Sequence, residues 1–310
     1  KGKQLDNSTS QLTADRVAAV IDRNYRAFAH YNSQRLHITA ELAGPQRAQL
    51  LELVPFLFHV NDRAFPGYVP EWNDNTGVHG FKQSHALRDL RRSLGWKEGA
   101  GTGLRGQPKI VSIASIGSAG TQAQTDKSDF DLWIVCRSGT SKGEYALIRR
   151  KADAIRTWLR TYIAELDINF YLATPRNVKR HVFGEVSDDS AGSALGTLLK
   201  EEFFRTCTIW CGQVPLWWCL PAEVSSEEEY LAWRQMLDRL DMPVAQNIMD
   251  MGTLVHSTPP QFLSALLWQT NKSLASPFKS LLKLSAVNRY AVEPDGKLLA
   301  ERLRANVLLN

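Results

Sequence analysis

The chain has 310 residues, of which 44% are hydrophobic and 22% charged, and it carries a formal net charge of +5. This balance is ordinary for a globular protein and excludes a low-complexity or fibrous chain. No apolar run approaches the roughly 20 residues that cross a bilayer, and no basic-then-apolar signal segment opens the sequence, so we expect a cytoplasmic protein without a membrane span.

Basic residues and cysteines give little functional signal. The densest basic clusters, at 88–92 and 149–151, lie in helical patterns typical of solvated helix faces, so we expect no nucleic acid partner. Cys207 and Cys211 are four residues apart, but no histidine or second cysteine pair completes a zinc set. The four cysteines are therefore expected to be free structural thiols.

The first part of the chain reads as helical. An apolar stripe from Thr13 predicts one helix, and Gly44-Pro45 opens a second, because proline suits a first helical turn. Pro55 is expected to bend or interrupt that second helix. An aromatic-rich Pro/Gly/Asn loop, a short helix at 85–94 and a glycine-rich link at 99–106 follow. We place the end of a helical N-terminal segment, residues 1–106, at this link.

The central stretch predicts two strands joined by a small-residue turn, at 110–116 and 129–136. Side chains alternate along a strand, so Asp129 and Asp131 point the same way. A hard divalent cation with oxygen ligands would relieve the repulsion between these carboxylates. At Gly117-Ser118, the small side chains let backbone N–H groups approach a phosphate. Taken alone, an Asp-x-Asp pair is a weak signal and is usually a solvated strand end.

Together these features resemble a known signature. Gly117-Ser118, ten intervening residues and Asp129-Phe130-Asp131 resemble the Gly-Ser…Asp-x-Asp pattern of the nucleotidyltransferase superfamily, which has a DNA polymerase beta-like fold. The fuller string at 116–136 resembles the version in bacterial class I adenylate cyclases of the enterobacterial type. Pro66-Gly67-Tyr68 is similar to a segment of those cyclases but receives no role. The resemblance implies an α/β (α+β) fold, with a mixed sheet between helical N-terminal and C-terminal segments.

The predicted catalytic core, residues 107–222, continues with a long helix at 142–165 and a strand at 166–172. In the superfamily a third carboxylate comes from a neighbouring strand, and Asp167 is the candidate. A helix at 195–207 sets Glu201 and Arg205 one turn apart, where they can pair. The sequence around Arg205 is similar to that of the cyclases, which makes Arg205 a candidate for the active site as well. A strand that carries Trp210, Trp217 and Trp218 is expected within 208–218.

Residues 223–310 are predicted to be a helical segment that completes the nucleotide cleft, with helices at 226–240, 261–272 and 278–290. Ser225-Ser226 followed by three glutamates resembles a capped start for the first of these helices. The sequence around Lys272 and Lys279 is similar to that of the cyclases, which makes both residues candidate triphosphate contacts. Solvated lysines are the simpler interpretation. The last helix, ending at Asn310, is expected to be cut short. The resemblance then implies a regulatory C-terminal region beyond it, with a regulator from the sugar phosphotransferase system as a candidate partner.

From the residues alone, we predict a metal-dependent enzyme that acts on a nucleoside triphosphate. The resemblance implies an adenylate cyclase that converts ATP to 3′,5′-cyclic AMP and pyrophosphate with two Mg²⁺ ions, or Mn²⁺, held by Asp129, Asp131 and Asp167. The implied nucleotide-binding residues are Gly117, Ser118, Arg205, Lys272 and Lys279. Two alternatives remain: a nucleotidyltransferase acting on an external hydroxyl, and a non-catalytic nucleotide-binding scaffold.

Overall fold

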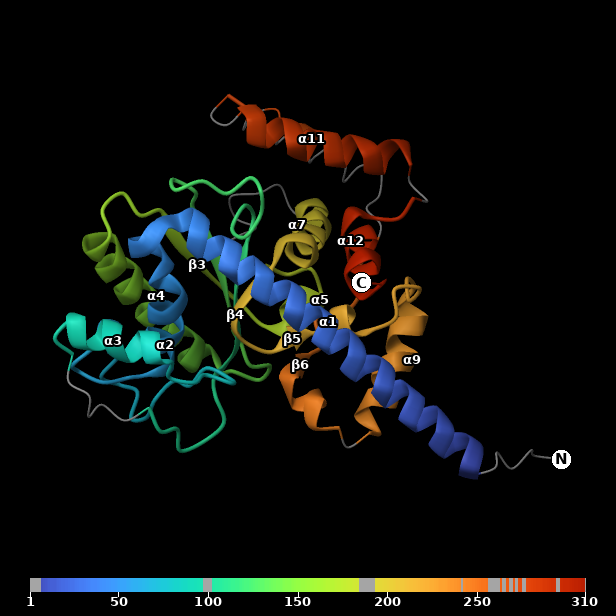
Figure 1. Ribbon diagram of the computed structural model, residues 1–310, viewed down its shortest axis with the longest axis horizontal. Coiled ribbons are helices and arrows are strands. Elements are labelled where there is room, and N and C mark those ends of the chain that lie inside the picture. Colours follow the sequence, from blue (N-terminus) through green and yellow to red (C-terminus); the bar gives the residue numbers. More distant parts are fainter. Residues whose placement is uncertain are drawn as a thin grey trace.

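The computed structural model describes residues 7–96, 102–183, 193–240, 242–255, 263, 266–267, 270, 273–274, 277–293 and 296–309. Its centre is a mixed sheet flanked by helices from both ends of the chain (Figure 1). The predicted α/β (α+β) fold is therefore confirmed. Within the described residues, every helix is too short or too polar to span a bilayer.

The sheet has four strands in the order β3-β2-β1-β4. β1 runs antiparallel to both β2 and β4, whereas β2 and β3 are parallel. The three predicted strands are confirmed in one sheet. The strands are β1 Ile110–Ile116, β2 Phe130–Cys136, β3 Ile168–Ala173 and β4 Thr208–Gly212. A separate two-stranded sheet pairs β5, Val214–Pro215, with β6, Ile248–Met249.

The N-terminal helices largely follow their sequence signals. α1, Asn7–Ala48, is broken by non-helical backbone at Gly44, as the Gly44-Pro45 pair predicted. α3, His85–Ser93, is capped by the Ser84 side chain. α2, Leu50–His59, continues through Pro55, so the expected interruption does not occur. The helix face around Pro55 is fully buried, and this burial offsets the hydrogen bond lost at proline.

Two hydrophobic cores lie on opposite faces of the sheet. Phe130, Leu132 and Ile134 of β2 face a core shared with α2, α3 and α4, Lys142–Tyr162. Trp133 and Val135 face the other core, which includes residues of α1, α7 (Ser193–Thr206) and α8 (Leu216–Cys219). This second core draws residues from all three predicted segments. The segment boundaries at 106 and 222 remain predictions.

One predicted strand is partly wrong. Trp210 lies in β4 as expected, but Trp217 and Trp218 belong to the short helix α8. Pro215 precedes that helix, and its fixed φ favours a helix start. Each tryptophan then packs on an aromatic ring of another helix: Trp218 lies 4.7 Å from the ring of Phe28, and Trp217 lies 4.8 Å from the ring of Phe204.

The C-terminal part contributes further helices. The predicted capped start is confirmed at α9, where Ser226 and Glu229 form a capping box. The helix predicted at 278–290 is confirmed as α11, whereas most of 261–272 lies outside the described residues. The remaining helices are α5 Pro175–Lys179, α9 Glu227–Asp238, a 3₁₀ turn at Pro243–Asn247, α11 Pro277–Val292 and α12 Leu299–Leu309.

Candidate active site

The three predicted carboxylates lie at one end of two neighbouring strands. β2 and β3 pair in parallel with Asp131 opposite Asn169, and the Phe130 N–H donates to the Asp167 carbonyl at 2.9 Å. Side chains alternate along each strand. Asp129 and Asp131 therefore share the sheet face on which Trp133 stacks against Phe203 of α7. The same alternation sets Asp167 and Asn169 on the face of β3 that Ala173 turns to this core.

Asn169 links two of these carboxylates. Its Nδ2 donates to Asp131 Oδ1 at 3.2 Å and to Asp167 Oδ1 at 3.3 Å. Arg160, in the last turn of α4, donates from Nη2 to the Ile168 carbonyl at 3.2 Å and lies 3.8 Å from Asp167 Oδ1. One amide nitrogen thus draws two carboxylate oxygens toward a single point. Sequence reasoning missed both Asn169 and Arg160.

The donor set suits a hard divalent cation. Mg²⁺ in proteins prefers carboxylate oxygens, and these oxygens come from adjacent strands on one sheet face. In the part of the chain that the structure describes, no three His, Cys, Asp or Glu side chains gather closely enough to hold a metal. Asp131 and Asp167 converge on Asn169 instead. A shared ion therefore requires side-chain adjustment at Asn169, while donor type and placement fit.

The Gly117-Ser118 turn follows β1 directly beside this end of β2, because Ile116 pairs with Asp131. Gly117 has a φ of 85°, and no atom beyond its chain neighbours lies within 4 Å of the position a Cβ would take. Glycine is therefore required by the backbone conformation, and the space beside it is open. The Ser118 carbonyl accepts the Thr121 N–H at 2.9 Å, which closes the turn.

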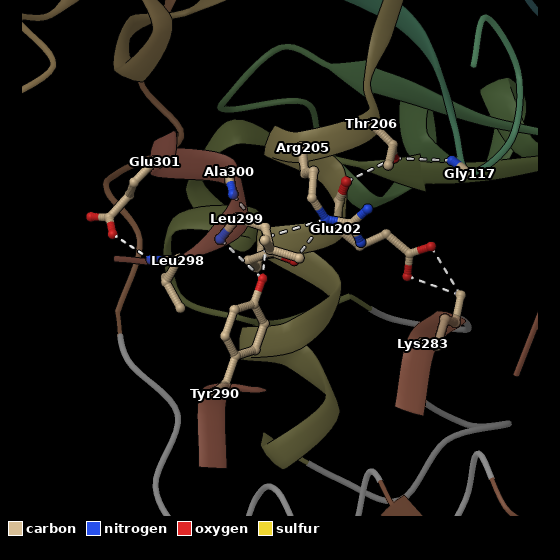
Figure 2. Close-up of polar contacts among 11 residues, drawn as sticks. Gly117, Glu202, Arg205, Thr206, Lys283, Tyr290, Leu298, Leu299, Ala300 and Glu301 are labelled. Atoms are coloured by element: carbon tan, nitrogen blue, oxygen red, sulfur yellow. Dashed lines mark hydrogen bonds and ion pairs between the residues drawn. The ribbon is translucent and has the colours of Figure 1, made fainter. Parts of the chain in front are cut away.

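The Gly117 N–H is already engaged in this structure. It donates to Thr206 Oγ1 at 3.0 Å, and the Thr206 hydroxyl donates to the Glu202 carbonyl at 2.7 Å (Figure 2). The end of α7 thereby meets the predicted phosphate-binding turn. Thr206 follows Arg205 directly, but nothing in the sequence singled it out.

Two arginines of α1 hold the backbone around the site. The buried Arg35 donates from Nη2 to the carbonyls of Ala119 and Thr206, both at 2.8 Å. Arg47 donates to the Ser128 carbonyl at 3.3 Å and to the Glu165 carbonyl at 2.9 Å, just ahead of the two acidic strands. The α1 helix thus fixes both the turn and the entry to β2 and β3. Neither arginine stands out in an amphipathic helical pattern.

Arg205 takes part in a junction between α7, α11 and α12. Its Nε lies 3.2 Å from Glu201 Oε1, which confirms the predicted pair. Tyr290 of α11 donates its hydroxyl to the same carboxylate at 2.9 Å, and the Ala300 N–H of α12 donates at 3.1 Å (Figure 2). Burial raises the pKa of Glu201, and Arg205 opposes that shift. A role for Arg205 in nucleotide binding stays a prediction.

The two candidate lysines are not placed. Lys272 lies outside the described residues. Lys279 lies in α11, but the structure describes only its backbone and not its side chain. Lys283, one turn further along α11, lies 2.9 Å from Glu202 Oε1 (Figure 2). This ion pair attaches α11 to α7 one turn before Thr206.

The predicted free thiols and the Pro66-Gly67-Tyr68 segment also find their places. All four cysteines are free, and Cys136, Cys207 and Cys219 are buried. Gly67 accepts a hydrogen bond at its carbonyl from the buried Lys151 Nζ of α4 at 2.9 Å. The segment is thus packed against the helix that leads to β3.

Comparison with known proteins agrees with the signature. Residues 21–218 match a family described as "Adenylate cyclase NT domain", and residues 258–310 match "Adenylate cyclase, class-I, second domain". An adenylate cyclase of Haemophilus influenzae is 28% identical over 296 residues, covering 89% of this chain and 34% of that protein. One of Salmonella typhimurium is 27% identical over 278 residues, covering 88% of this chain and 32% of that protein. The chain spans about a third of the length of these relatives. No solved structure matches it.

Proposed function

This chain belongs to the class I adenylate cyclase family, and from that premise we propose that it converts ATP to 3′,5′-cyclic AMP and pyrophosphate. In this reaction the ribose 3′-oxygen bonds to the α-phosphorus, and the bond from the α-phosphorus to the oxygen bridging to the β-phosphorus breaks. The 3′-hydroxyl proton is lost. The main supporting observation is that Asp131 and Asp167 turn their carboxylates to one Asn169 amide, beside the open Gly117 turn.

The three acids share the metal in this proposal, and Asp167 has a second role. Mg²⁺ or Mn²⁺ bound by Asp129, Asp131 and Asp167 would neutralise triphosphate charge and lower the pKa of the 3′-hydroxyl. Asp129 and Asp131 supply anionic oxygens from one strand. Asp167, whose side chain is 64% exposed, orients the hydroxyl or accepts its proton. Asn169 keeps two carboxylates converged before the nucleotide arrives, and its side chain turns aside when they share an ion.

The phosphate end of ATP is assigned to the turn. The N–H groups of Gly117 and Ser118 bind the β- and γ-phosphates, so the Gly117 N–H exchanges Thr206 Oγ1 for a phosphate oxygen. Arg205, Lys272 and Lys279 add positive charge, which stabilises the leaving pyrophosphate. Lys283 stays with Glu202 and holds α11 against α7.

The test is product identity. The purified chain is incubated with ATP and Mg²⁺, and in parallel with Mn²⁺, and the nucleotides are identified by mass. Cyclic AMP and pyrophosphate in equal amounts, without an added acceptor, support the proposal. Transfer of a nucleoside monophosphate to an external hydroxyl supports the nucleotidyltransferase alternative, and ATP binding without turnover supports the scaffold. An Asp131→Asn protein prepared in the same way excludes a contaminating cyclase.

A further inference from the structure

A second charged region lies at the opposite end of the sheet from the carboxylates. A cavity of about 400 Å³ there is lined by the charged residues Arg137, Arg176, Lys179, Arg234 and Asp250. Arg137 directly follows β2 and lies six positions after Asp131 along the chain, a span of about 20 Å. The other charged residues come from α5, α9 and the residue after β6, whose elements are labelled in Figure 1. We call this space the basic cavity. It is separate from the candidate active site.

Among the described residues, Asp250 is the single carboxylate that lines the basic cavity, and it is already satisfied. Asp250 Oδ2 lies 3.1 Å from Lys179 Nζ and 3.0 Å from Arg234 Nε. Its Oδ1 accepts the Tyr230 hydroxyl at 2.6 Å and the Gly252 N–H at 2.9 Å. Asp250 therefore has no remaining strong attraction for further cations. Of the described residues that line the cavity, four are basic and one is acidic, so an excess of positive charge remains among them.

Two of the arginines carry most of that excess. Arg137 donates to the neutral side chain of Gln107, and among the described residues no carboxylate forms an ion pair with Arg137 or Arg176. Arg176 is exposed at the cavity wall. A guanidinium presents its N–H groups as a planar fork that matches phosphate oxygens. These two side chains come from different segments and can approach an anion from two sides.

A buried lysine lies behind the same wall. Lys200 of α7 is 1% exposed, and a Cβ added at Gly252 would lie 3.2 Å from its Nζ and 2.9 Å from Lys179 Cγ. Burial lowers the pKa of Lys200 to about 8, while Asp250 opposes the shift and Lys179 adds to it. Gly252 has a φ of 74° and allows this close approach. Lys200 thus adds a further basic group close to Lys179 and Asp250, two of the residues that line the cavity.

We propose that the basic cavity binds a small molecule carrying a phosphate or diphosphate group. Its volume lies within the range of small-molecule sites, roughly 300–1,000 Å³. The guanidiniums of Arg137 and Arg176 hold the phosphate, and Val111 and Met249 offer apolar surface to the rest of the ligand. A nucleic acid is disfavoured because the cations gather in a concave site, whereas a polyanionic strand needs a basic stripe along the surface.

The experiment measures binding of inorganic pyrophosphate to the whole chain by calorimetry, with a chelator present so that metal at the carboxylates plays no part. Arg137→Ala and Arg176→Ala are each expected to weaken binding about tenfold, equivalent to about 1.4 kcal/mol. Arg180→Ala is the matched control, because Arg180 is exposed one residue beyond α5 and does not line the cavity. It is expected to change the dissociation constant less than twofold.

Further arms identify the ligand class. Higher salt is expected to weaken binding, since the contacts are between charges partly open to solvent. A nucleoside monophosphate that displaces pyrophosphate supports a phosphate-ester ligand, whereas displacement by orthophosphate alone supports a free-phosphate site. Equal affinity in Arg137→Ala, Arg176→Ala and the original protein overturns the proposal. Tighter binding of an oligonucleotide, lost in the same variants, also overturns the assignment to a small molecule. No cyclase activity is measured, so failure of the proposed function leaves this test intact.

Discussion

Carboxylates set side by side at the end of a buried strand repel one another, and this repulsion costs stability unless donors or cations offset it. Here the Asn169 amide donates to Asp131 and Asp167, and Arg160 lies near Asp167. These contacts hold Asp131 and Asp167 in place, but the Asn169 amide is neutral and does not cancel their charge. At the residue scale, the acids are therefore expected to serve chemistry at some cost to the empty fold.

Replacing Asp131 with Asn keeps its shape but removes an anionic metal ligand. We expect cyclic AMP formation to fall at least ~10²-fold in Asp131→Asn and in Asp129→Asn, the general scale for losing a charge-stabilising group. The free energy of unfolding should be unchanged or slightly higher, because one like-charge repulsion disappears. Asp167→Asn should also abolish turnover while retaining more ATP–Mg²⁺ binding.

The measurements are product formation by mass and unfolding in urea. Asp126→Asn is the matched control, since Asp126 is an exposed acid of the preceding loop, and it should leave both quantities unchanged. Near-normal cyclic AMP output from Asp131→Asn would end the assignment of this site. Loss of stability in all three variants would instead indicate structural carboxylates.

Lys151 makes a separate prediction about pH. It is 1% exposed, donates to the carbonyls of Val60 and Gly67, and burial lowers its pKa to about 7. Between about pH 7 and pH 10 the unfolded chain binds this proton more strongly than the folded protein, so the Lys151 contribution to stability rises with pH. Below about pH 7 both states are protonated and that contribution is lost.

Comparison with Lys151→Met isolates this effect, because methionine has no proton to exchange. The difference in unfolding free energy between the two proteins should shift in favour of the lysine protein by up to about 1.4 kcal/mol per pH unit within the window. Urea unfolding at pH 7 and pH 9 measures it. A difference that stays constant with pH would show that Lys151 remains charged in the fold.

At the element scale, the end of α7 and the turn after β1 are joined through one hydroxyl. Thr206 accepts the Gly117 N–H and donates to the Glu202 carbonyl within its own helix. Arg35 of α1 donates to the Thr206 carbonyl and to the turn itself. The phosphate-binding turn is therefore positioned by two helices that lie far from it in sequence.

Thr206→Val removes the hydroxyl while keeping the branched shape. We expect a loss of about 1 kcal/mol of stability, the usual net value of one hydrogen bond. ATP affinity should be unchanged or higher, because the freed Gly117 N–H no longer exchanges partners. Chemical unfolding and calorimetric ATP binding measure the two effects. Thr206→Ser keeps the hydroxyl and should resemble the original protein, whereas a large loss of ATP affinity in Thr206→Val would contradict this role.

On the scale of the whole molecule, both ends of the chain help to form the core behind the site. Phe28 of α1 and Tyr290 of α11 contribute to the same core as Trp133. Arg304 of α12 is fully buried and lies 4.1 Å from the Trp217 ring centroid. It donates to the carbonyls of Trp217, Ala222 and Val224 at 2.9, 3.2 and 2.6 Å. The C-terminal helix is therefore tied to α8 and the loop after it.

Arg304→Ala leaves the buried carbonyls of Trp217 and Val224, and the partly buried one of Ala222, without this donor and opens space beside Trp217. We expect a loss of at least about 3 kcal/mol in unfolding free energy. Arg302→Ala is the control, since Arg302 is partly exposed and pairs only weakly, with Nη2 3.8 Å from Glu293 Oε2, and it should change stability by less than about 0.5 kcal/mol. Urea unfolding compares the two. Equal losses would mean that α12 is not held through Arg304.

The local sequence pattern by itself determined several strands, one helix start and one ion pair of this protein. β-branched and apolar runs marked β1 and β2, alternating polar and apolar residues marked β3, and the Ser226–Glu229 spacing marked the start of α9. The Glu201–Arg205 pair lies within one helical turn. Such features depend on residues a few positions apart, where backbone geometry fixes which side chains meet. The Gly-Ser…Asp-x-Asp pattern could be identified for the same reason, because its residues lie close together in the sequence.

Contacts between distant segments were decided only by the tertiary structure. Asn169 lies 38 residues from Asp131, Gly117 lies 89 residues from Thr206, and the basic cavity draws its arginines from three separate elements. The strand prediction was also wrong for Trp217 and Trp218, which lie in the helix α8 and pack against Phe204 and Phe28. Strand order and helix packing bring such residues together, and burial in a shared core outweighs the weak preferences that a short stretch of sequence expresses.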